Sequence, residues 1–459
     1  MKSVKVLIIS LIIFSLSINI SPIVFADIPD EKVQNSEMAT MVLKYLNIIS
    51  ESEGITFDAT KGVKREELAR FLWKLNDDNQ ELLPCETNFK DVDSTNANSG
   101  YISAMNKAKV MLGDTDGLFY PEQLITYNEA IITLVRLCGY EPMVDIKSGS
   151  DGYYKVATSI DLLKGIANTS KTDVISCGTL LTLMYNSLDI PLMMIEKYGE
   201  NPTYIKDENK TILTEVFGLY FEEGVVSATC DTALTHEKSG LQKSQVEISG
   251  KVYATSGSSV ETYLGHKIKF LYKNLDGSHE REVVLVLKDF SRVTQINADD
   301  IIEFSDYTYL VHDENSKNSV KYKIQVNCDI LYNGRAIESV IDTHVFVPKT
   351  GDVKLVDNNN DGKYDVIFVS EYTAMIVDNV NIKEMTIYDK HDSERNIKID
   401  IPFENVMVKD ENGKMIFIDL FAIIIWRDIM SKIDNKSALF DVKCTKALPD
   451  EIIKLGGVP

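Results

Sequence analysis

Basic residues are scarce in this chain relative to acidic ones. Its 459 residues include 48 Lys and Arg against 69 Asp and Glu, which gives a formal charge of −21. Nucleic-acid binding needs clustered Lys and Arg that neutralise phosphates, so this composition excludes nucleic acid as an expected partner. Proline is also scarce, with 11 residues, and 44% of the residues are hydrophobic, which excludes a collagen-like fibre and wholesale disorder. At about 150 residues per domain, the length predicts two or three globular domains.

Long apolar runs are absent beyond the N-terminus. Lys2 and Lys5 precede an apolar run over residues 6–20, and a small-residue ending at Ala26 leads into Asp27. This order predicts a signal peptide over residues 1–26 and export of the remainder, with an uncleaved anchor helix as the alternative. No later run reaches the roughly 20 apolar residues of a membrane span, so none is expected after cleavage.

Cysteine and histidine are few, six of each, and neither has a metal-binding or catalytic spacing. The absence of a C-x-x-C pair argues against zinc, and the disulfide pairing stays open. Cys138 and Cys177 lie in apolar helical contexts, which favours buried free thiols. The chain also lacks H-E-x-x-H, G-x-S-x-G and phosphate-loop motifs, so no catalytic residue is assigned and a non-enzymatic protein is expected.

The N-terminal third contains an internal repeat, which recurs after 62 and then 50 residues, from Val63 to Ile125 to Ile175. Each copy predicts a helix, a glycine-containing turn and a second, amphipathic helix. Apolar residues of the second helices recur at i, i+3, i+4 and i+7, which predicts a buried stripe. The stripes are Leu68, Phe71, Leu72 and Leu75 in copy one, Ala130, Thr133, Leu134 and Leu137 in copy two, and Leu180, Leu183, Met184 and Ser187 in copy three.

Copy two carries the most specific motifs. It reads F-K-D-V at residues 89–92, G-D-T-D-G-L-F-Y-P at 113–121 and I-T-Y-N-E at 125–129. In these segments the sequence resembles the S-layer homology family. The resemblance covers three tandem copies, at about residues 33–84, 85–145 and 146–195 of a domain over 27–195. It implies an all-α, three-repeat pseudo-trimer that binds secondary cell wall polysaccharide, often through a pyruvylated sugar, in a secreted protein of the cell wall or S-layer of a Gram-positive-type bacterium.

The residues that open the second helices are the candidates for polysaccharide binding. Thr126 and Glu129 have the spacing of a capping box, in which a hydroxyl and a carboxylate satisfy backbone N–H groups. An arginine one residue after the cap has no capping task, and its guanidinium suits a carboxylate ligand; only copy one keeps it, as Arg65. Tyr127 replaces the arginine in copy two and is assigned sugar stacking, whereas copy three has Cys177. The candidates are Arg65, Lys64, Glu67, Tyr127, Thr126 and Glu129, and the alternative is a module that has become chiefly structural.

After residue 195 the pattern changes. Residues 196–223 are predicted as a linker and residues 224–459 as a β-rich region, because short alternating runs such as Val246–Tyr253 are separated by turn signals. One or two antiparallel domains, sandwich-like or barrel-like, are expected, with a break near residues 297–300. The fold class is therefore α + β and multidomain.

One loop of this region has the composition of a calcium site. Oxygen-bearing residues at alternating positions and a glycine at the sixth are what Ca²⁺ takes from a tight loop. The expected ligands are Asp357, Asn359, Asp361, the carbonyl of Lys363, and Asp365. The twelfth position is Phe368, so the bidentate glutamate of an EF-hand is missing. The alternative is an Asn/Asp/Gly-rich β-turn without an ion.

The sequence thus predicts a non-enzymatic cell-surface protein whose repeats hold it to the wall while the β-rich region projects outward to an unknown partner. One rival is an anchored polysaccharide hydrolase that uses paired carboxylates, for which Glu222–Glu223 and Asp299–Asp300 are the candidates. Another is a glycan-binding protein, which needs exposed aromatic platforms among Tyr307, Tyr309, Tyr332 and Tyr364. Truncation of a longer protein stays open.

Overall fold

The computed structural model describes residues 31–49, 58–76, 81–167, 169–197, 199, 202–235, 240–275, 280–313, 319–332, 334–337, 343–381, 386–389, 397–398, 406–409, 415–418, 441–446 and 453–454. The predicted signal peptide lies outside these residues. The chain divides into two compact units, residues 1–74 with 79–190 and residues 75–78 with 191–459. The architecture is α + β, as expected.

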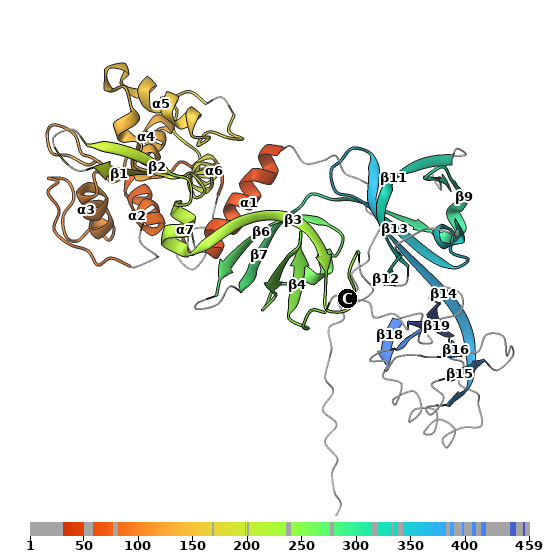
Figure 1. The fold of residues 1–459 in the computed structure, drawn as a ribbon. Helices are drawn as coiled ribbons and strands as arrows, with labels where there is room; N and C mark the ends of the chain where they lie inside the picture. Colours follow the sequence, from red (N-terminus) through yellow and green to blue (C-terminus); the bar gives the residue numbers. More distant parts are fainter. Residues whose placement is uncertain are drawn as a thin grey trace, which may run out of the picture. The chain divides into compact units, whose positions relative to one another are not determined.

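The first unit is helical (Figure 1). Its helices are α1 Glu31–Tyr45, α2 Arg65–Asn76, α3 Ser99–Lys107, α4 Tyr127–Leu137, α5 Ser150–Ser159 and α6 Cys177–Ser187, with the 3₁₀ turns η2 Glu141–Met143 and η3 Ile146–Ser148 between α4 and α5. The predicted stripes of α2, α4 and α6 form much of its core. Leu68, Leu72, Ala130, Leu134, Leu180, Leu183 and Met184 are all 0% exposed, so the period-3.6 prediction is confirmed.

The predicted helix caps are also present. At α4 the Thr126 side chain accepts from the Glu129 N–H, and the Glu129 carboxylate accepts from the Thr126 N–H at 2.8 Å, which completes a capping box. At α6 Ser176 accepts from the N–H of Thr179. In copy one, where Lys64 occupies the cap position, the Glu67 carboxylate accepts from the Lys64 N–H at 2.7 Å, so half of the box survives.

The three segments that lead into these helices contact one another in a ring. Isolated antiparallel bridges join Gly62 to Ser176, Lys64 to Leu124, and Thr126 to Val174, so each segment touches both others. Gly62 permits this approach, because a Cβ there would lie 2.9 Å from a methyl of Val174. The starts of α2, α4 and α6 are therefore held close together.

The second unit opens with regular structure where the sequence predicted a linker. Residues 196–223 include parts of the hairpin β1 Leu192–Lys197 and β2 Thr203–Asp207, the helix α7 Ile212–Phe217, and the first residues of β3 Leu219–Ala228. The polar composition misled the prediction, because a two-stranded ribbon leaves much of its side-chain surface in water. Met194, Ile195, Tyr204 and Ile205 are all at least 37% exposed.

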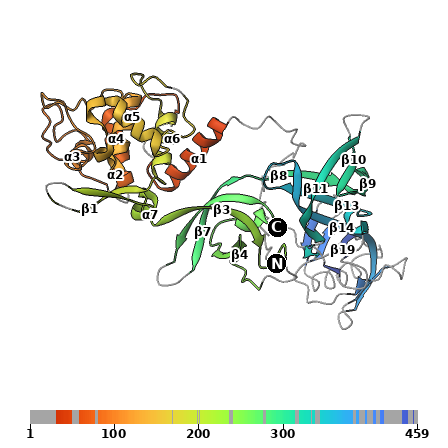
Figure 2. The ribbon, with the colours of Figure 1, turned by 45° about the horizontal axis from the view of Figure 1, so that its top comes forward.

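A closed five-stranded barrel follows, along which β3 bends (Figure 2). Besides β3, its strands are β4 Gln245–Ile248, β5 Lys251–Ala254, β6 Lys267–Asn274 and β7 Arg281–Asp289, joined in the order β3-β4-β5-β7-β6. The β5–β7 pair is parallel and the other pairs are antiparallel. This order is the Greek-key topology of an OB-fold barrel. The turn η4 Val260–Tyr263 lies between β5 and β6.

The run from Val246 to Tyr253, predicted as one strand, is a hairpin. Ser249 and Gly250 have φ values of +47° and +78°, and two consecutive positive φ angles make the tight two-residue turn that reverses a strand. Val246 therefore pairs with Tyr253, and both side chains are buried in the barrel core.

A larger sheet system begins directly after the barrel. Its elements are β8 Arg292–Asn297, η5 Ala298–Asp300, β9 Ile301–Ser305, β10 Thr308–His312, β11 Ser319–Tyr332, β12 Arg335–Ala336, η6 Thr343–Phe346, β13 Gly351–Asp357, β14 Lys363–Asn381, β15 Thr386–Asp389, β16 Ile397–Lys398, β17 Val406–Lys409, β18 Met415–Ile418, β19 Asp441–Lys446 and β20 Ile453–Lys454. The barrel ends at Asp289, so the predicted break near 297–300 falls inside this second sheet, at η5. Its core includes Tyr309, Val353, Leu355 and Ile367.

Candidate functional site

Arg65 lies in a seam between copies one and two. It opens α2, and its guanidinium donates from Nη1 to Glu129 Oε1 and from Nη2 to the Leu112 carbonyl, both at 2.8 Å. The guanidinium carbon stands 5.0 Å from the ring centre of Phe119, in the G-D-T-D-G-L-F-Y-P loop. The side chain is 14% exposed, and its buried Nε has no hydrogen-bond partner. The candidate cation is thus already paired with protein groups on two of its three nitrogens.

The electrostatics of this seam follow from its partial burial. Burial lowers the pKa of Arg65 from its ordinary value, and the Glu129 carboxylate opposes that change. An arginine still keeps its charge at any physiological pH. A carboxylate ligand would therefore meet a permanent cation whose existing partner is the carboxylate of Glu129.

The helix N-termini of the ring are closed to anions. The N–H groups of Arg65 and Glu66 donate to the carbonyls of Gln123 and Pro121, at 2.9 and 3.1 Å. The first amides of α4 donate likewise to Asp173 and Lys171, and those of α6 to Lys61 and Ala59. A helix N-terminus can bind an anion only through free backbone N–H groups, and here the loop of another repeat already accepts from these donors. An anion at this ring would therefore have to be held by side chains.

The other two seams carry no cation at the equivalent position. Tyr127 opens α4 and is 2% exposed, so its predicted stacking on sugar is corrected: the ring has no exposed face. Burial raises the pKa of the Tyr127 hydroxyl to about 12. Cys177 opens α6, and burial, with Glu67 and Asp58 nearby, raises the pKa of its thiol to about 11. The charged seam is the one that holds Arg65.

The remaining candidates of copy one and copy two contact protein groups near the helix starts. The Lys64 ammonium forms an ion pair with Glu122, and both side chains are well exposed, at 42% and 69%. That hydrogen bond raises the pKa of Lys64. Thr126, Glu129 and Glu67 serve the helix starts within their own copies. Across the seam between the copies, the structure pairs Arg65 with Glu129. Sequence reasoning missed this pairing.

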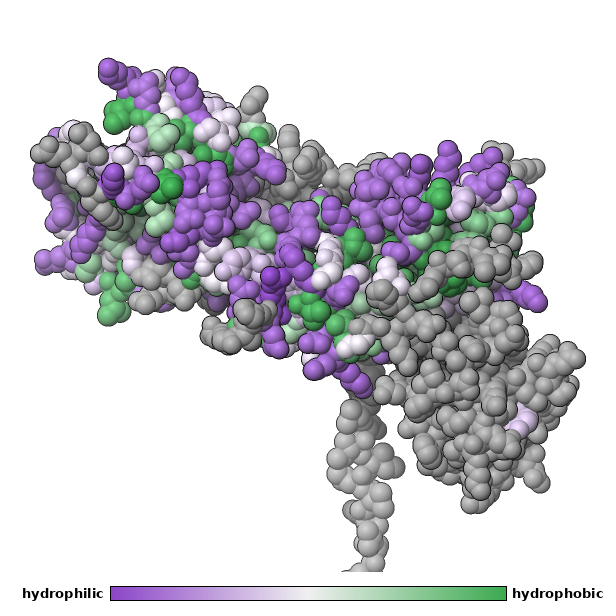
Figure 3. Space-filling view, viewed as in Figure 1, coloured by the Kyte–Doolittle hydropathy of each residue, from purple (hydrophilic) through white to green (hydrophobic). Residues whose placement is uncertain are grey.

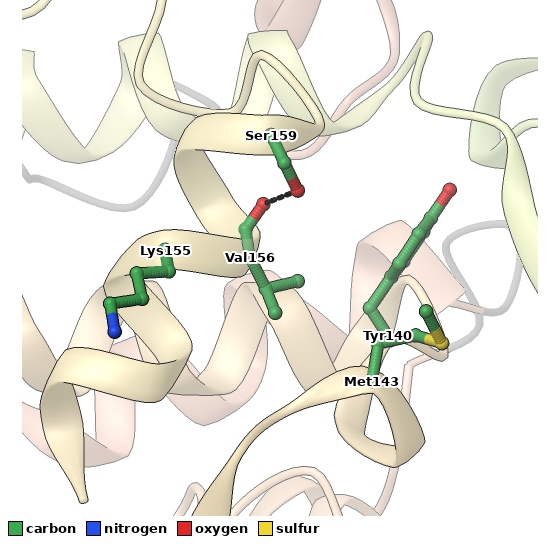
Figure 4. Close-up of a pocket in the computed structure, with 5 residues that line it drawn as sticks. All are labelled: Tyr140, Met143, Lys155, Val156 and Ser159. Atoms are coloured by element: carbon green, nitrogen blue, oxygen red, sulfur yellow. Dashed lines mark hydrogen bonds between the residues drawn. The ribbon is translucent and has the colours of Figure 1, made fainter. Parts of the chain in front are cut away.

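A small hollow lies elsewhere in the first unit, between η2 and α5 (Figure 4). It has a volume of about 320 Å³ and is lined by Tyr140, Met143, Lys155, Val156 and Ser159. Ser159 is turned back to donate to the Val156 carbonyl at 2.8 Å. Met143 is 60% exposed at the rim.

Hydrophilic residues cover most of the coloured surface in Figure 3, and the apolar spots on it are small and scattered.

The predicted calcium ligands lie around the turn between β13 and β14. Asp357 is 1% exposed, and its Oδ1 accepts from the N–H groups of Asn359 and Asn360 while its Oδ2 accepts from Gly362. Asp365 accepts from the N–H of Asn358 at 2.7 Å. Burial raises the pKa of Asp365, and the neighbouring Asp357 and Asp361 add to this rise. Within the described residues no group of three or more His, Cys, Asp or Glu is arranged to hold a metal, and calcium binding stays a prediction.

The tyrosines proposed as glycan platforms are mostly core residues. Tyr309, Tyr332 and Tyr364 are 0%, 6% and 4% exposed, so burial removes them from that role, and Tyr307 alone of the four is exposed, at 48%. Three of the carboxylates proposed for a hydrolase have protein partners. Glu222 accepts from the Tyr253 hydroxyl, Glu223 lies 3.9 Å from the Lys267 ammonium, and Asp300 accepts from Asn297.

Comparison with known proteins bears on the helical unit. The family model described as the S-layer homology domain matches residues 88–131, which include the F-K-D-V segment, the loop beside Arg65, and Glu129. The chain contains an S-layer homology domain. Among the described residues of this S-layer homology protein, no helix has the length and apolar character that a membrane crossing requires.

Three relatives that match this chain carry the names of surface or cell-wall proteins. A surface layer protein of Brevibacillus choshinensis is 23% identical over 418 residues, which cover 78% of this chain and 35% of the relative. A cell surface protein of Thermoanaerobacter kivui is 25% identical over 355 residues, 74% of this chain and 42% of the relative. A middle cell wall protein of Brevibacillus brevis is 24% identical over 177 residues, 38% and 16% of the two chains. The chain spans less than half the length of each. Domain and relatives together indicate a secreted cell-wall or S-layer protein of a Gram-positive-type bacterium.

Proposed function

We propose that the helical unit anchors this protein by binding secondary cell wall polysaccharide, and that the β-rich unit is a non-enzymatic structural or interaction region. The observation that carries the proposal is the position of Arg65. It places a permanent cation, 14% exposed, beside a loop that lies within the S-layer homology match. A sugar carboxylate, such as a pyruvyl acetal, is the ligand that suits a guanidinium.

The proposed module is a pseudo-trimer of three repeats. Its support is the ring of bridges among the segments at Gly62, Leu124 and Val174, together with the matching hydrogen bonds that close each helix start on the loop of another repeat. A cyclic arrangement of this kind creates three similar seams. Replacement of arginine by Tyr127 and Cys177 in two of them leaves one charged seam.

The relatives support the proposed non-enzymatic role of the β-rich unit. The relatives carry the names of surface layer, cell surface and cell wall proteins, and two of them align over most of this chain. Structural names over that extent favour a structural role for this unit too.

Sedimentation with purified wall sacculi tests the anchor. The full secreted chain is mixed with sacculi before and after chemical removal of the secondary polymer, and the pelleted fraction is measured for wild type, Arg65→Gln and Arg136→Gln. Arg136 is the matched control, because it has a similar exposure of 17% and an ion pair with Glu141 at 2.9 Å. It lies in the last turn of α4, and its charge is near enough to help lower the pKa of Arg65, so this variant also tests whether a neighbouring cation is sufficient.

We expect polymer-dependent pelleting that Arg65→Gln reduces at least about tenfold, since a charge-assisted hydrogen bond contributes about 1.5–3 kcal/mol. Arg136→Gln should pellet like wild type. Thermal unfolding of each variant identifies any loss that comes from misfolding. Equal pelleting of a folded Arg65→Gln protein would remove Arg65 from the site, and no polymer-dependent pelleting of wild type would refute the anchor.

A further inference from the structure

One end of the barrel carries charged and aromatic side chains on its inward face. Tyr220 and Glu222 of β3 stand directly opposite Tyr272 and Phe270 of β6 in the antiparallel register. Directly opposed residues lie on the same face of a sheet. Phe270 is 0% exposed in the barrel core, so this face is the inner one. Tyr220, Glu222 and Tyr272 therefore approach the barrel axis, and each of them keeps partial exposure.

These residues form one connected cluster with β5 and β7. The Glu222 carboxylate accepts from the Tyr253 hydroxyl at 2.7 Å and is paired with the Lys251 ammonium. The Arg281 guanidinium stands 5.9 Å from the ring centre of Tyr253 and 5.8 Å from that of Tyr272. The cluster closes the barrel end with polar groups, although Tyr253 itself is buried.

The outer rings of the cluster form a platform. The rings of Tyr220 and Tyr272 are stacked, with centres 5.1 Å apart and planes 20° apart. A guanidinium beside stacked aromatic rings is a planar donor next to an apolar face. Sugar rings present the complementary surfaces, C–H groups on one face and hydroxyl or carboxylate groups at the edge.

The charge of the cluster favours an acidic ligand. Lys251 and Arg281 supply two cations against the single carboxylate of Glu222. Glu222 is engaged by Lys251 and Tyr253, and Arg281 is near enough to help lower the pKa of its carboxyl. Within the described part of the chain, no carboxylate lies within ion-pair distance of Arg281. The whole chain carries −21, so a local excess of positive charge runs against its composition.

We propose that this end of the barrel binds an acidic saccharide, with the sugar ring on the Tyr220–Tyr272 platform and the carboxylate on Arg281. The site lies in a different unit from Arg65, so it goes beyond the proposed wall anchor and does not depend on it. The rival explanation is that the cluster is a polar plug that only closes the barrel.

Calorimetric titration of the full secreted chain with tetragalacturonic acid, and with its methyl ester, tests this site. The two probes share the sugar rings and differ in the carboxylate charge. Variants are Arg281→Gln, Arg281→Lys and Tyr220→Leu, with Arg292→Gln as the control, because Arg292 is an exposed arginine at the start of β8 and outside the cluster. The same titration of Arg65→Gln separates this site from the repeats.

We expect saturable binding of the acid, weakened at least about tenfold by methylation and by Arg281→Gln. Tyr220→Leu should weaken the binding of both probes. The affinity of Arg281→Lys for the acid should lie between those of wild type and Arg281→Gln, and the affinities of Arg292→Gln and Arg65→Gln should match wild type. If Arg281→Gln does not fold, Arg281→Lys and Tyr220→Leu carry the test. Absence of acid binding to folded wild type, binding unaffected by the folded Arg281 and Tyr220 variants, or loss of binding with Arg65→Gln would each overturn the proposal.

Discussion

An anionic ligand of Arg65 must compete with the Glu129 carboxylate, and the strength of the Arg65–Glu129 ion pair can be predicted. The two groups are 2.8 Å apart, with side chains 14% and 31% exposed, so the pair lies between a surface ion pair and a buried one. Surface pairs couple by about 0.2–1 kcal/mol, and breaking a buried pair costs about 3–5 kcal/mol. We therefore expect a coupling energy of about 1–2.5 kcal/mol for this pair.

A double-mutant cycle measures this coupling. Its variants are Arg65→Gln, Glu129→Gln and the double variant. Glutamine at position 129 still completes the capping box with Thr126, so the cycle removes the charge pair without removing the helix cap. The hydrogen bond from Arg65 to the Leu112 carbonyl is lost in both variants that lack the arginine, and it cancels in the cycle.

Urea unfolding followed by helical circular dichroism supplies the four free energies of unfolding. The transition of the helical unit is the one to fit, because the chain has two units that need not unfold together. The coupling should fall only slightly at high salt, since salt screens exposed pairs more than partly buried ones. A coupling below about 0.5 kcal/mol would refute the reasoning and would mean that Arg65 is free to change partner at little cost.

Three further predictions concern calcium, a buried cysteine and an acid-sensitive carboxylate. The loop that holds Asp357 should bind calcium with a dissociation constant of about 10⁻³ M, as in weak extracellular sites, and Asp357→Asn should weaken the binding about tenfold. If calorimetric titration of the folded protein with calcium shows no heat of binding, this prediction is wrong. Burial raises the pKa of the Cys138 thiol to about 12, whereas Cys85 is partly exposed. Iodoacetamide at about pH 8 should therefore label Cys85 well before Cys138, as measured by peptide mass spectrometry. Equal labelling rates would contradict the burial of Cys138. Burial alone would raise the pKa of Asp289, but hydrogen bonds from His266 and the Ser291 N–H lower it overall. Its contribution to stability should therefore be present above its unfolded pKa of about 3.9 and be lost as the pH falls through the lower folded value. Unfolding of wild type and Asp289→Asn between about pH 6 and pH 3 should show the two stabilities converge, and a constant difference would contradict the assignment.

The helical unit was largely predictable because its determinants are local. Helix periodicity placed the stripe of α4, and the spacing of Thr126 and Glu129 placed its start. The approach of Arg65 to Glu129 joins residues 64 positions apart and was not predicted. The repeat held a usable signal: Arg65 and Tyr127 are equivalent positions, as are Glu67 and Glu129, so a ring of repeats brings the arginine of one copy to the glutamate of the next.

For the β-rich unit, the sequence predicted the fold class but not the pairing of the strands. Alternating runs indicated strands, but barrel closure rests on pairings such as the parallel one between Ala254 and Glu282, which no short-range pattern reports. The hairpin at Ser249 and Gly250 was missed because the alternation continues through the turn, although a Ser-Gly pair is itself a turn signal. The Arg281 cluster was missed for the same reason as the barrel, since its members come from four strands.

A single charged seam has a consequence for wall attachment. Three equivalent seams on one chain would let a polymer engage several sites at once, and linked sites raise avidity by about 10²–10⁴ over one site. With Tyr127 buried and Cys177 uncharged at about neutral pH, the proposed anchor has one anion-binding seam, so each chain forms one charged contact with the polymer. Retention at the wall then depends on the affinity of that contact, on neutral contacts from the other seams, or on sites outside the helical unit. The binding curves of wild type and Arg281→Gln with the polymer distinguish these cases. If the wild-type curve is steeper than a one-site curve and the Arg281→Gln curve fits one site, the additional contact lies in the barrel.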